Sequence, residues 1–237
     1  MTNLKKAAFA AFLLGTGSFL LSSCDHPDGQ GIPVQNKSGK NNDVEKKALA
    51  SVSSQAVPVG GTTVIMYPLA LRTQNKADEG FKRYSSDSDS GPYWNIAFYD
   101  LKTGNSNLLD SGRAILINSF QKLKTLIIYK VTITDYNSND KLDDTDPVYL
   151  FTSDLNGKSF KQITPNDIDA KSFQVINGTE IILIQAIKDS TKDKKFGNDD
   201  EVIPMIFDAT KATAAKHVFS TPFNKKVSQE FNKLYKN

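Results

Sequence analysis

The stretch Thr125-Leu-Ile-Ile-Tyr-Lys-Val-Thr-Ile-Thr-Asp135 decides the fold, because the chain repeats it. A second copy, Thr179-Glu-Ile-Ile-Leu-Ile-Gln-Ala-Ile-Lys-Asp189, aligns with it without gaps 54 residues further on. A third copy lies upstream, where Asp100-Leu101 matches Asp154-Leu155 at the same shift of 54 residues. Repetition at a fixed spacing predicts an architecture built from similar units.

Each unit is predicted to contain four antiparallel strands. Tyr129, Val131 and Ile133 alternate with polar residues, which is the pattern of a strand with one buried face. Its second copy, residues 181–187, is almost continuously apolar, and we expect it to be covered on both faces. Further strands are expected over 148–153, 159–164 and 172–176, the last of which leads into the apolar strand of the second copy.

Two segments at the ends of these strands resemble a known family. Phe98-Tyr-Asp-Leu-Lys-Thr-Gly104 and Leu150-Phe-Thr-Ser-Asp-Leu-Asn-Gly157, the latter followed by Gln162-Ile-Thr-Pro165, resemble the rhythm of TolB-type propeller blades. The resemblance implies an all-β, propeller-like body with three four-stranded blade units, at about 62–113, 114–168 and 169–220. Three blades are fewer than the four to eight that close a propeller. An open wedge, a curved sheet and a homodimer that completes one ring all fit this number.

Residues 221–237 are predicted to form a C-terminal amphipathic helix. Thr221 can cap it and Pro222 suits its first position. Its apolar face comprises Phe223, Val227, Phe231, Leu234 and Tyr235. We expect this face to lie over the open sheet and protect its edge, with docking of a partner as the alternative role.

The beginning of the chain is typical of an exported protein. In residues 1–24, Lys5 and Lys6 precede an apolar run that ends in Leu21-Ser-Ser-Cys24. This ending resembles a bacterial lipobox, which implies cleavage before Cys24 and a lipid on its thiol; an ordinary signal peptide or an uncleaved anchor is the alternative. Cys24 is the only cysteine, so disulfides and cysteine-ligated zinc are excluded. Residues 25–61 are rich in Gly, Ser, Asn and Lys and are predicted to form a flexible tether.

Charge limits the range of partners. From residue 24 onward the chain carries 27 Lys and Arg against 26 Asp and Glu. This balance does not favour nucleic acid as a partner. We therefore expect a lipid-anchored protein of a bacterial cell envelope, on either the periplasmic face or the cell surface. Together with the loops described next, these features are similar to uncharacterised envelope lipoproteins of the Bacteroidota.

The residues that follow the first quoted strand have the spacing of a calcium loop. Side-chain oxygens fall at positions 1, 3, 5, 9 and 12 of the loop, with a main-chain carbonyl expected at position 7. These positions are Asp135, Asn137, Asn139, Asp143 and Asp146, with Lys141 at position 7. Asp140 stands at position 6, where glycine is usual, and Asp can adopt the required left-handed conformation. A polar turn without metal is the alternative.

The second copy offers a weaker calcium site. It keeps Asp189, Thr191, Asp193 and Asp200. Lys194 and Lys195 stand in the middle of this loop, and two ammonium groups would repel a dication.

Few residues favour catalysis. The two histidines, His26 and His217, lie far apart in the sequence, and no phosphate-binding or metalloprotease motif is present. Tyr93 and Trp94 follow the longest of the predicted loops, which contains residues 85–90. The two aromatic residues could contact a partner, or Trp94 could occupy a core position. The predicted function is non-catalytic binding or scaffolding of an envelope protein or glycan. The alternative is an envelope hydrolase that uses loop carboxylates.

Overall fold

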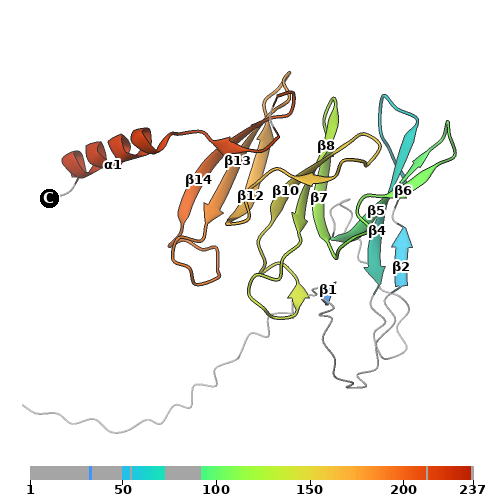
Figure 1. Cartoon of the computed structure of the whole chain (residues 1–237), viewed down its shortest axis with the longest axis horizontal. Helices are drawn as coiled ribbons and strands as arrows, with labels where there is room; N and C mark the ends of the chain where they lie inside the picture. Colours follow the sequence, from blue (N-terminus) through green and yellow to red (C-terminus); the bar gives the residue numbers. More distant parts are fainter. Residues whose placement is uncertain (1–31, 34–49, 54, 73–91, 212, 236–237) are drawn as a thin grey trace, which may run out of the picture.

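The structure is a computed structural model that describes residues 32–33, 50–53, 55–72, 92–211 and 213–235. The predicted signal segment with Cys24, most of the tether and the loop that contains residues 85–90 lie outside these ranges. Within them the chain is mostly β, with one helix at the C-terminal end (Figure 1). The expected all-β class with a C-terminal helix is thus confirmed at this coarse level.

The strands of the described ranges form antiparallel sheets, none of which is closed. The largest sheet has the order β11-β10-β8-β7-β5-β4-β2, with β3 paired to β4 and β6 paired to β5. A four-stranded sheet has the order β12-β13-β14-β15, and β1 pairs with β9. The strands are β1 (Ile32–Pro33), β2 (Ala50–Ser53), β3 (Val57–Pro58), β4 (Val64–Arg72), β5 (Tyr93–Asp100), β6 (Ser106–Leu108), β7 (Leu116–Lys122), β8 (Leu126–Thr132), β9 (Lys141–Leu142), β10 (Tyr149–Asp154), β11 (Lys161–Gln162), β12 (Ile168–Val175), β13 (Ile181–Lys188), β14 (Glu201–Asp208) and β15 (Lys216–His217).

Strand pairing recurs along the chain. Tyr67 on β4 lies opposite Ala97 on β5, and Tyr129 on β8 lies opposite Phe151 on β10. The second pair follows the first by 62 residues on one strand and 54 on the other. The next pairing also recurs, because Ala97 opposes Leu108 as Phe151 opposes Gln162.

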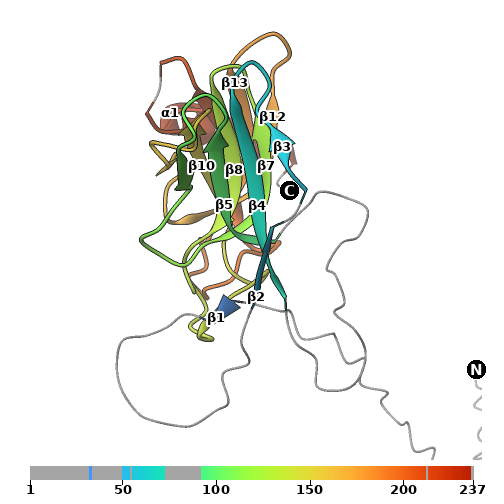
Figure 2. The same cartoon turned by 90° about the vertical axis from the view of Figure 1, so that its right-hand side faces the viewer.

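Two hydrophobic cores hold the sheets together. The largest sheet consists of two halves, which are joined by a bridge between Tyr93 and Ile117. One half contains β2 to β6, and the other contains β7, β8, β10 and β11. The halves pack against each other through the first core, which includes Phe98 and Tyr129. The second core joins β8 and β10 to the four-stranded sheet and includes Ile128. The long strands of both halves and of the last sheet run nearly parallel to one axis in both views (Figures 1 and 2).

Burial of β8 and β13 is the reverse of the prediction. On β8, Tyr129 lies in the first core and Ile128 in the second, so both faces are covered. On β13, Ile182 and Ile184 are buried, whereas Leu183 is 38% exposed. The expectation that residues 181–187 are covered on both faces is therefore wrong. The reason is position: β13 belongs to the last sheet, and no element of the described ranges packs on its outer face.

The helix α1 (Thr221–Tyr235) also differs from the prediction. It extends away from the sheets instead of lying over them (Figure 1), and none of its residues is buried. Its first turn is held by Ser220, whose carbonyl accepts a hydrogen bond from the amide of Asn224 at 3.0 Å. Phe219 stacks on Phe223 with ring centroids 5.0 Å apart, which fixes the direction of the helix. No helix of the described ranges has the length and apolar character needed to cross a membrane.

Candidate functional site: two adjoining acidic loops

The two predicted calcium loops connect long strands at the same end of the molecule. Residues 135–146, here called the inner loop, lie between β8 and β10 and contain β9. Residues 189–200, here called the outer loop, lie between β13 and β14. Both loops are at the lower end of the sheets in Figure 1.

The two loops begin with the same hydrogen bonds. Asp135 accepts a bond on Oδ2 from the amide of Asp140 at 2.8 Å, and Asp189 accepts one on Oδ2 from the amide of Lys194 at 3.3 Å. The donors stand at the same place in each loop, five residues after the aspartate. Both loops also turn through the left-handed region at matching positions, with φ of 61° to 64°, at Ser138, Asp140, Lys192 and Lys194. Asp140 thus adopts the conformation that the sequence required of it.

The loops end with the same hydrogen bonds as well. The amide of Asp143 donates to Oδ2 of Asp146 at 3.2 Å, and the amide of Gly197 donates to Oδ2 of Asp200 at 3.0 Å. The amide of Tyr136 donates to Oδ1 of Asp146 at 2.8 Å, and the amide of Ser190 donates to Oδ1 of Asp200 at 2.9 Å. The two loops therefore share one backbone design, with aspartates that tie their ends together.

The pKa values of the aspartates that close the two loops are shifted in opposite directions. Asp146 is only 3% exposed, and burial raises its pKa above the ordinary value of 3.8. Asp200 lies nearer to solvent, and hydrogen bonds, first of all from the amide of Gly197, lower its pKa to about 2. Burial alone would raise the pKa of Asp143, but hydrogen bonds from Thr145 and then from Asn139 hold it below its ordinary value.

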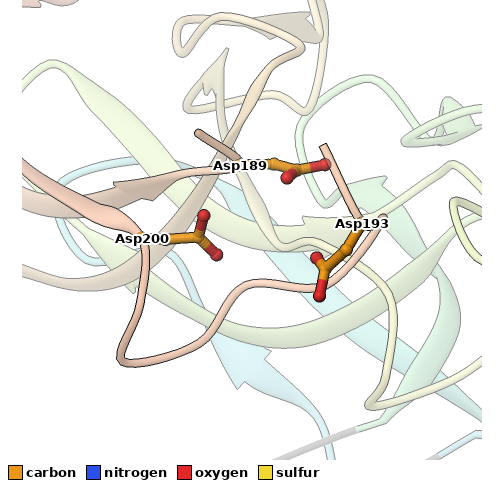
Figure 3. A group of neighbouring side chains, drawn as sticks. All are labelled: Asp189, Asp193 and Asp200. Carbon is orange, nitrogen blue, oxygen red and sulfur yellow. The ribbon is translucent and has the colours of Figure 1, made fainter. Parts of the chain in front are cut away.

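The outer loop brings three carboxylates together. Oxygens of Asp189, Asp193 and Asp200 lie within 4.8 Å of one another. Figure 3 shows the three side chains around a common space. Hard oxygen ligands at this spacing suit a divalent cation such as calcium. Thr191, the fourth predicted residue of this loop, donates its amide to Asp200 at 3.2 Å.

The inner loop has a more mixed set of oxygens. Among the described residues it does not form such a group of three carboxylates. Asn137 and Asn139 accept backbone hydrogen bonds on their amide oxygens, both at 2.9 Å. Lys141 pairs with Pro33 of β1, so the position predicted to offer a carbonyl is held in a short sheet. The predicted residues therefore lie in one ordered loop.

The lysines of the outer loop lie differently from what their sequence positions imply. The ammonium group of Lys194 donates to Oγ of Ser138 in the inner loop at 3.3 Å. The amide of Lys195 donates to the carboxylate of Asp193 at 3.0 Å. At least one of the two ammonium groups that were expected to repel a cation thus contacts the neighbouring loop.

The contact between the loops was not predicted. Tyr136 of the inner loop packs on Phe196 of the outer loop, with ring centroids 5.2 Å apart. The hydroxyl of Tyr136 donates to Oδ2 of Asp189 at 2.8 Å. Burial, and then this bond to a carboxylate, raises the pKa of Tyr136 to about 12. One signal was available in the sequence, because each loop has a single aromatic residue among polar ones.

Residues proposed for other roles lie apart from the loops. Tyr93 is 7% exposed and packs 6.3 Å from Phe120 in the first core, so its ring is not offered to a partner. Trp94 is half-buried, and His217 is exposed on β15.

Comparison with known proteins gives no further assignment. No protein-family model matches the chain, and a search of curated proteins found no match. The fold and the site define a β-rich protein with antiparallel open sheets and two joined acidic hairpin loops. Its function is therefore inferred from its own residues.

Proposed function

We propose that this chain is a non-catalytic binding or scaffolding protein of a bacterial cell envelope whose two hairpin loops are stabilised by calcium. The observation that carries the proposal is the convergence of Asp189, Asp193 and Asp200 in a loop whose hydrogen bonds recur in the inner loop. Three carboxylates at this separation repel one another, and a divalent cation would relieve that repulsion.

The inner loop would bind a second ion with fewer charges. Its ligands would be the side chains of Asp135, Asn137, Asn139, Asp143 and Asp146 and the carbonyl of Lys141. Calcium tolerates this mixture of carboxylate, amide and carbonyl oxygens because its coordination is flexible. In this role calcium acts on stability, as a staple at one end of the sheets.

The rest of the proposal concerns the body and its anchor. The strand pairing of β4, β5 and β6 recurs in β8, β10 and β11, which supports a repeated blade-like unit. We propose three such units that do not close a ring. Part of the range predicted as a tether, namely β2, β3 and buried Val59, belongs to the body. A lipid on Cys24 and the chain that precedes β2 would hold this body near a membrane, where loops could present surfaces to a protein or glycan. Metabolic labelling with palmitate tests the anchor: the native chain incorporates label, and Cys24→Ser abolishes it.

Calcium binding is tested by thermal unfolding of the chain that begins at Asp25, which contains every described residue. Melts in EDTA, in millimolar calcium and in millimolar magnesium are compared. Free calcium at about ten times Kd adds about 1.4 kcal/mol, enough to raise Tm by a few degrees. We expect a rise with calcium that magnesium does not reproduce.

Matched variants assign the effect to the loops. Asp200→Asn removes a carboxylate of the outer-loop group, and Asp199→Asn makes the same charge change at an exposed neighbour outside it. Asp146→Asn and Asp144→Asn form the corresponding pair in the inner loop. We expect the first member of each pair to reduce the calcium response and the second to preserve it. A Tm that calcium leaves unchanged would refute the proposed stabilisation of the loops by calcium.

A further inference from the structure

Exposed apolar side chains are concentrated at the C-terminal end of the molecule. Of the thirteen large apolar residues that are exposed within the described ranges, ten come after residue 175. We call these ten the C-terminal apolar surface: Ile176, Leu183, Val202, Val218, Phe219, Phe223, Val227, Phe231, Leu234 and Tyr235. Exposed apolar side chains that are concentrated in one region of a protein indicate an interaction site.

One part of this surface is the outer face of the last sheet. Because side chains alternate along strands, Leu183 and Gln185 on β13 and Val202 and Pro204 on β14 point away from the second core. All four are exposed, and none is charged. Val202 is 55% exposed. The face is thus an apolar platform without a charge at its centre.

The other part is the stripe of α1. Phe223, Val227, Phe231 and Leu234 follow one another at helical spacing and are 46% to 66% exposed. A helix of 15 residues is marginal in water by itself and normally gains its stability from packing of the apolar face. No residue of the helix is buried, although Phe219, just before the helix, stacks on Phe223.

The helix is poorly placed to cover the last sheet of its own chain. The amide of Val218 donates to the carbonyl of Pro204 at 3.0 Å, which ties the chain to β14 three residues before α1 begins. The intervening segment is held by the stack of Phe219 on Phe223 and by the bond from Asn224 to Ser220. A return of α1 onto β13 and β14 would have to break these contacts.

We propose that two copies of this chain exchange α1, so that α1 of each copy lies across the outer face of β13 and β14 of the other. One symmetrical contact then covers both unpartnered surfaces, since the uncharged stripe meets the uncharged platform. A lipid surface would cover the helix alone and leave Leu183 and Val202 in water.

The area is sufficient for a stable dimer. Large aromatic and aliphatic side chains bury on the order of 100 Å² each when half of their surface is already covered. Five such residues on each helix and the four residues of each platform give on the order of 1,800 Å² for the two symmetrical contacts. This matches the size of specific, stable interfaces. Exchange of a terminal element is a common route to twofold dimers.

The first experiment measures the mass of the chain from Asp25 by light scattering, in EDTA and in calcium, so that it stands independently of the proposed metal sites. We expect twice the monomer mass at micromolar concentration in both. Phe231→Gln should raise the dissociation constant at least about tenfold, whereas Asn232→Gln on the polar face of α1 should leave it unchanged. Because both residues are exposed, neither variant should unfold the chain. A monomeric native chain overturns the proposal, and sedimentation of that monomer with anionic vesicles would assign α1 to a membrane.

The second experiment tests whether the helix crosses between copies. The chain from Asp25 has no cysteine, so Val227→Cys and Leu183→Cys can be placed in separate chains and mixed. A short bismaleimide should then join one chain of each kind. In a double variant, a product linked within one chain at high dilution would show that α1 covers its own sheet, and it would overturn the exchange.

Discussion

Two hairpins of this molecule have related sequences but different surroundings. The inner hairpin consists of β8, the inner loop and β10; the outer hairpin consists of β13, the outer loop and β14. Their loops share hydrogen bonds, yet the inner hairpin is covered on both faces and the outer hairpin on one. β13 is the more apolar of the two first strands and still the more exposed. The difference in burial depends on what packs against each strand. β8 contributes to both hydrophobic cores, whereas β13 contributes only to the second.

The same difference continues into the loops. The inner loop lies against more of the protein, and its closing Asp146 is buried; the outer loop reaches further into solvent. The carboxylates of the outer loop converge, whereas the inner loop has an amide, Asn139, at the position that corresponds to Asp193. The inner loop is thus the more buried of the two, and the outer loop is the one that brings three carboxylates together near solvent.

The largest effect is expected from deleting a side chain of β8. Tyr129 is fully buried and shares a hydrogen bond of 2.7 Å with Ser153. Tyr129→Ala should lower the free energy of unfolding by about 3–5 kcal/mol, because it leaves a cavity and removes a buried hydrogen bond. Leu183→Ala, at the position that the sequence aligns with Tyr129, should cost less than about 1 kcal/mol in the monomer. Urea unfolding measures both.

Protein concentration sharpens this first comparison. If a second copy covers the outer face of β13, the loss from Leu183→Ala should grow as concentration rises, while the loss from Tyr129→Ala stays nearly constant. Equal losses for the two variants at high dilution would mean that β13 is covered within one chain, contrary to the structure.

A second test concerns the contact that buries the inner hairpin. Gly157 follows β10 with φ of 73°, and a Cβ there would overlap the ring of Phe98 from the other half of the sheet. Gly157→Ala should therefore cost about 2–4 kcal/mol, from overpacking and from the left-handed backbone. Gly104→Ala is the matched control, since φ is 74° and a Cβ would meet open space. It should cost about 1 kcal/mol, and a loss as large as that of Gly157→Ala would show that the clash is relieved elsewhere.

Local patterns in the sequence predicted a good part of this structure. Alternation and turn residues located β8, β10 and β13, and the spacing of Asp135 and Asp146 located a loop whose ends are tied together. Helical periodicity located α1 within a few residues of its bounds. These features depend on residues near one another in the chain, so their signals are local.

What the sequence did not reveal depends on contacts between distant elements. The gapless alignment matches Tyr129, which is buried, with Leu183, which is exposed. The buried residue nearest to this position is Ile184, one residue later. A shift of one residue exchanges the two faces of a strand, and identical apolar residues in both copies conceal it. The direction of α1 is set by the contacts of Val218 and Phe219, which periodicity does not report.

A smaller effect is expected where the two loops meet. Tyr136→Phe keeps the ring on Phe196 and removes the hydroxyl that donates to Asp189. The loss should be about 1.5 kcal/mol in EDTA, at the lower end of the range for a hydrogen bond to a charged group. A double-mutant cycle with Asp189→Asn should recover a similar coupling energy. A coupling near zero would mean that the loops adjoin without stabilising each other.

The smallest effect is the opposite response of Asp146 and Asp200 to acid. Asp200 has a folded-state pKa of about 2, below its ordinary 3.8, so its contribution to stability is complete above about pH 4 and is lost as pH falls toward 2. The pKa of Asp146 is raised, so its contribution is complete below 3.8, in the neutral form, and is lost as pH rises through the folded-state pKa. Carboxyl NMR titration in EDTA should give Asp146 the higher pKa of the two. Calcium would lower both apparent values, because it binds the ionised forms. A reversed order of the two pKa values in EDTA would mean that Asp200, and not Asp146, is the buried aspartate. This would contradict the difference in burial between the two loops.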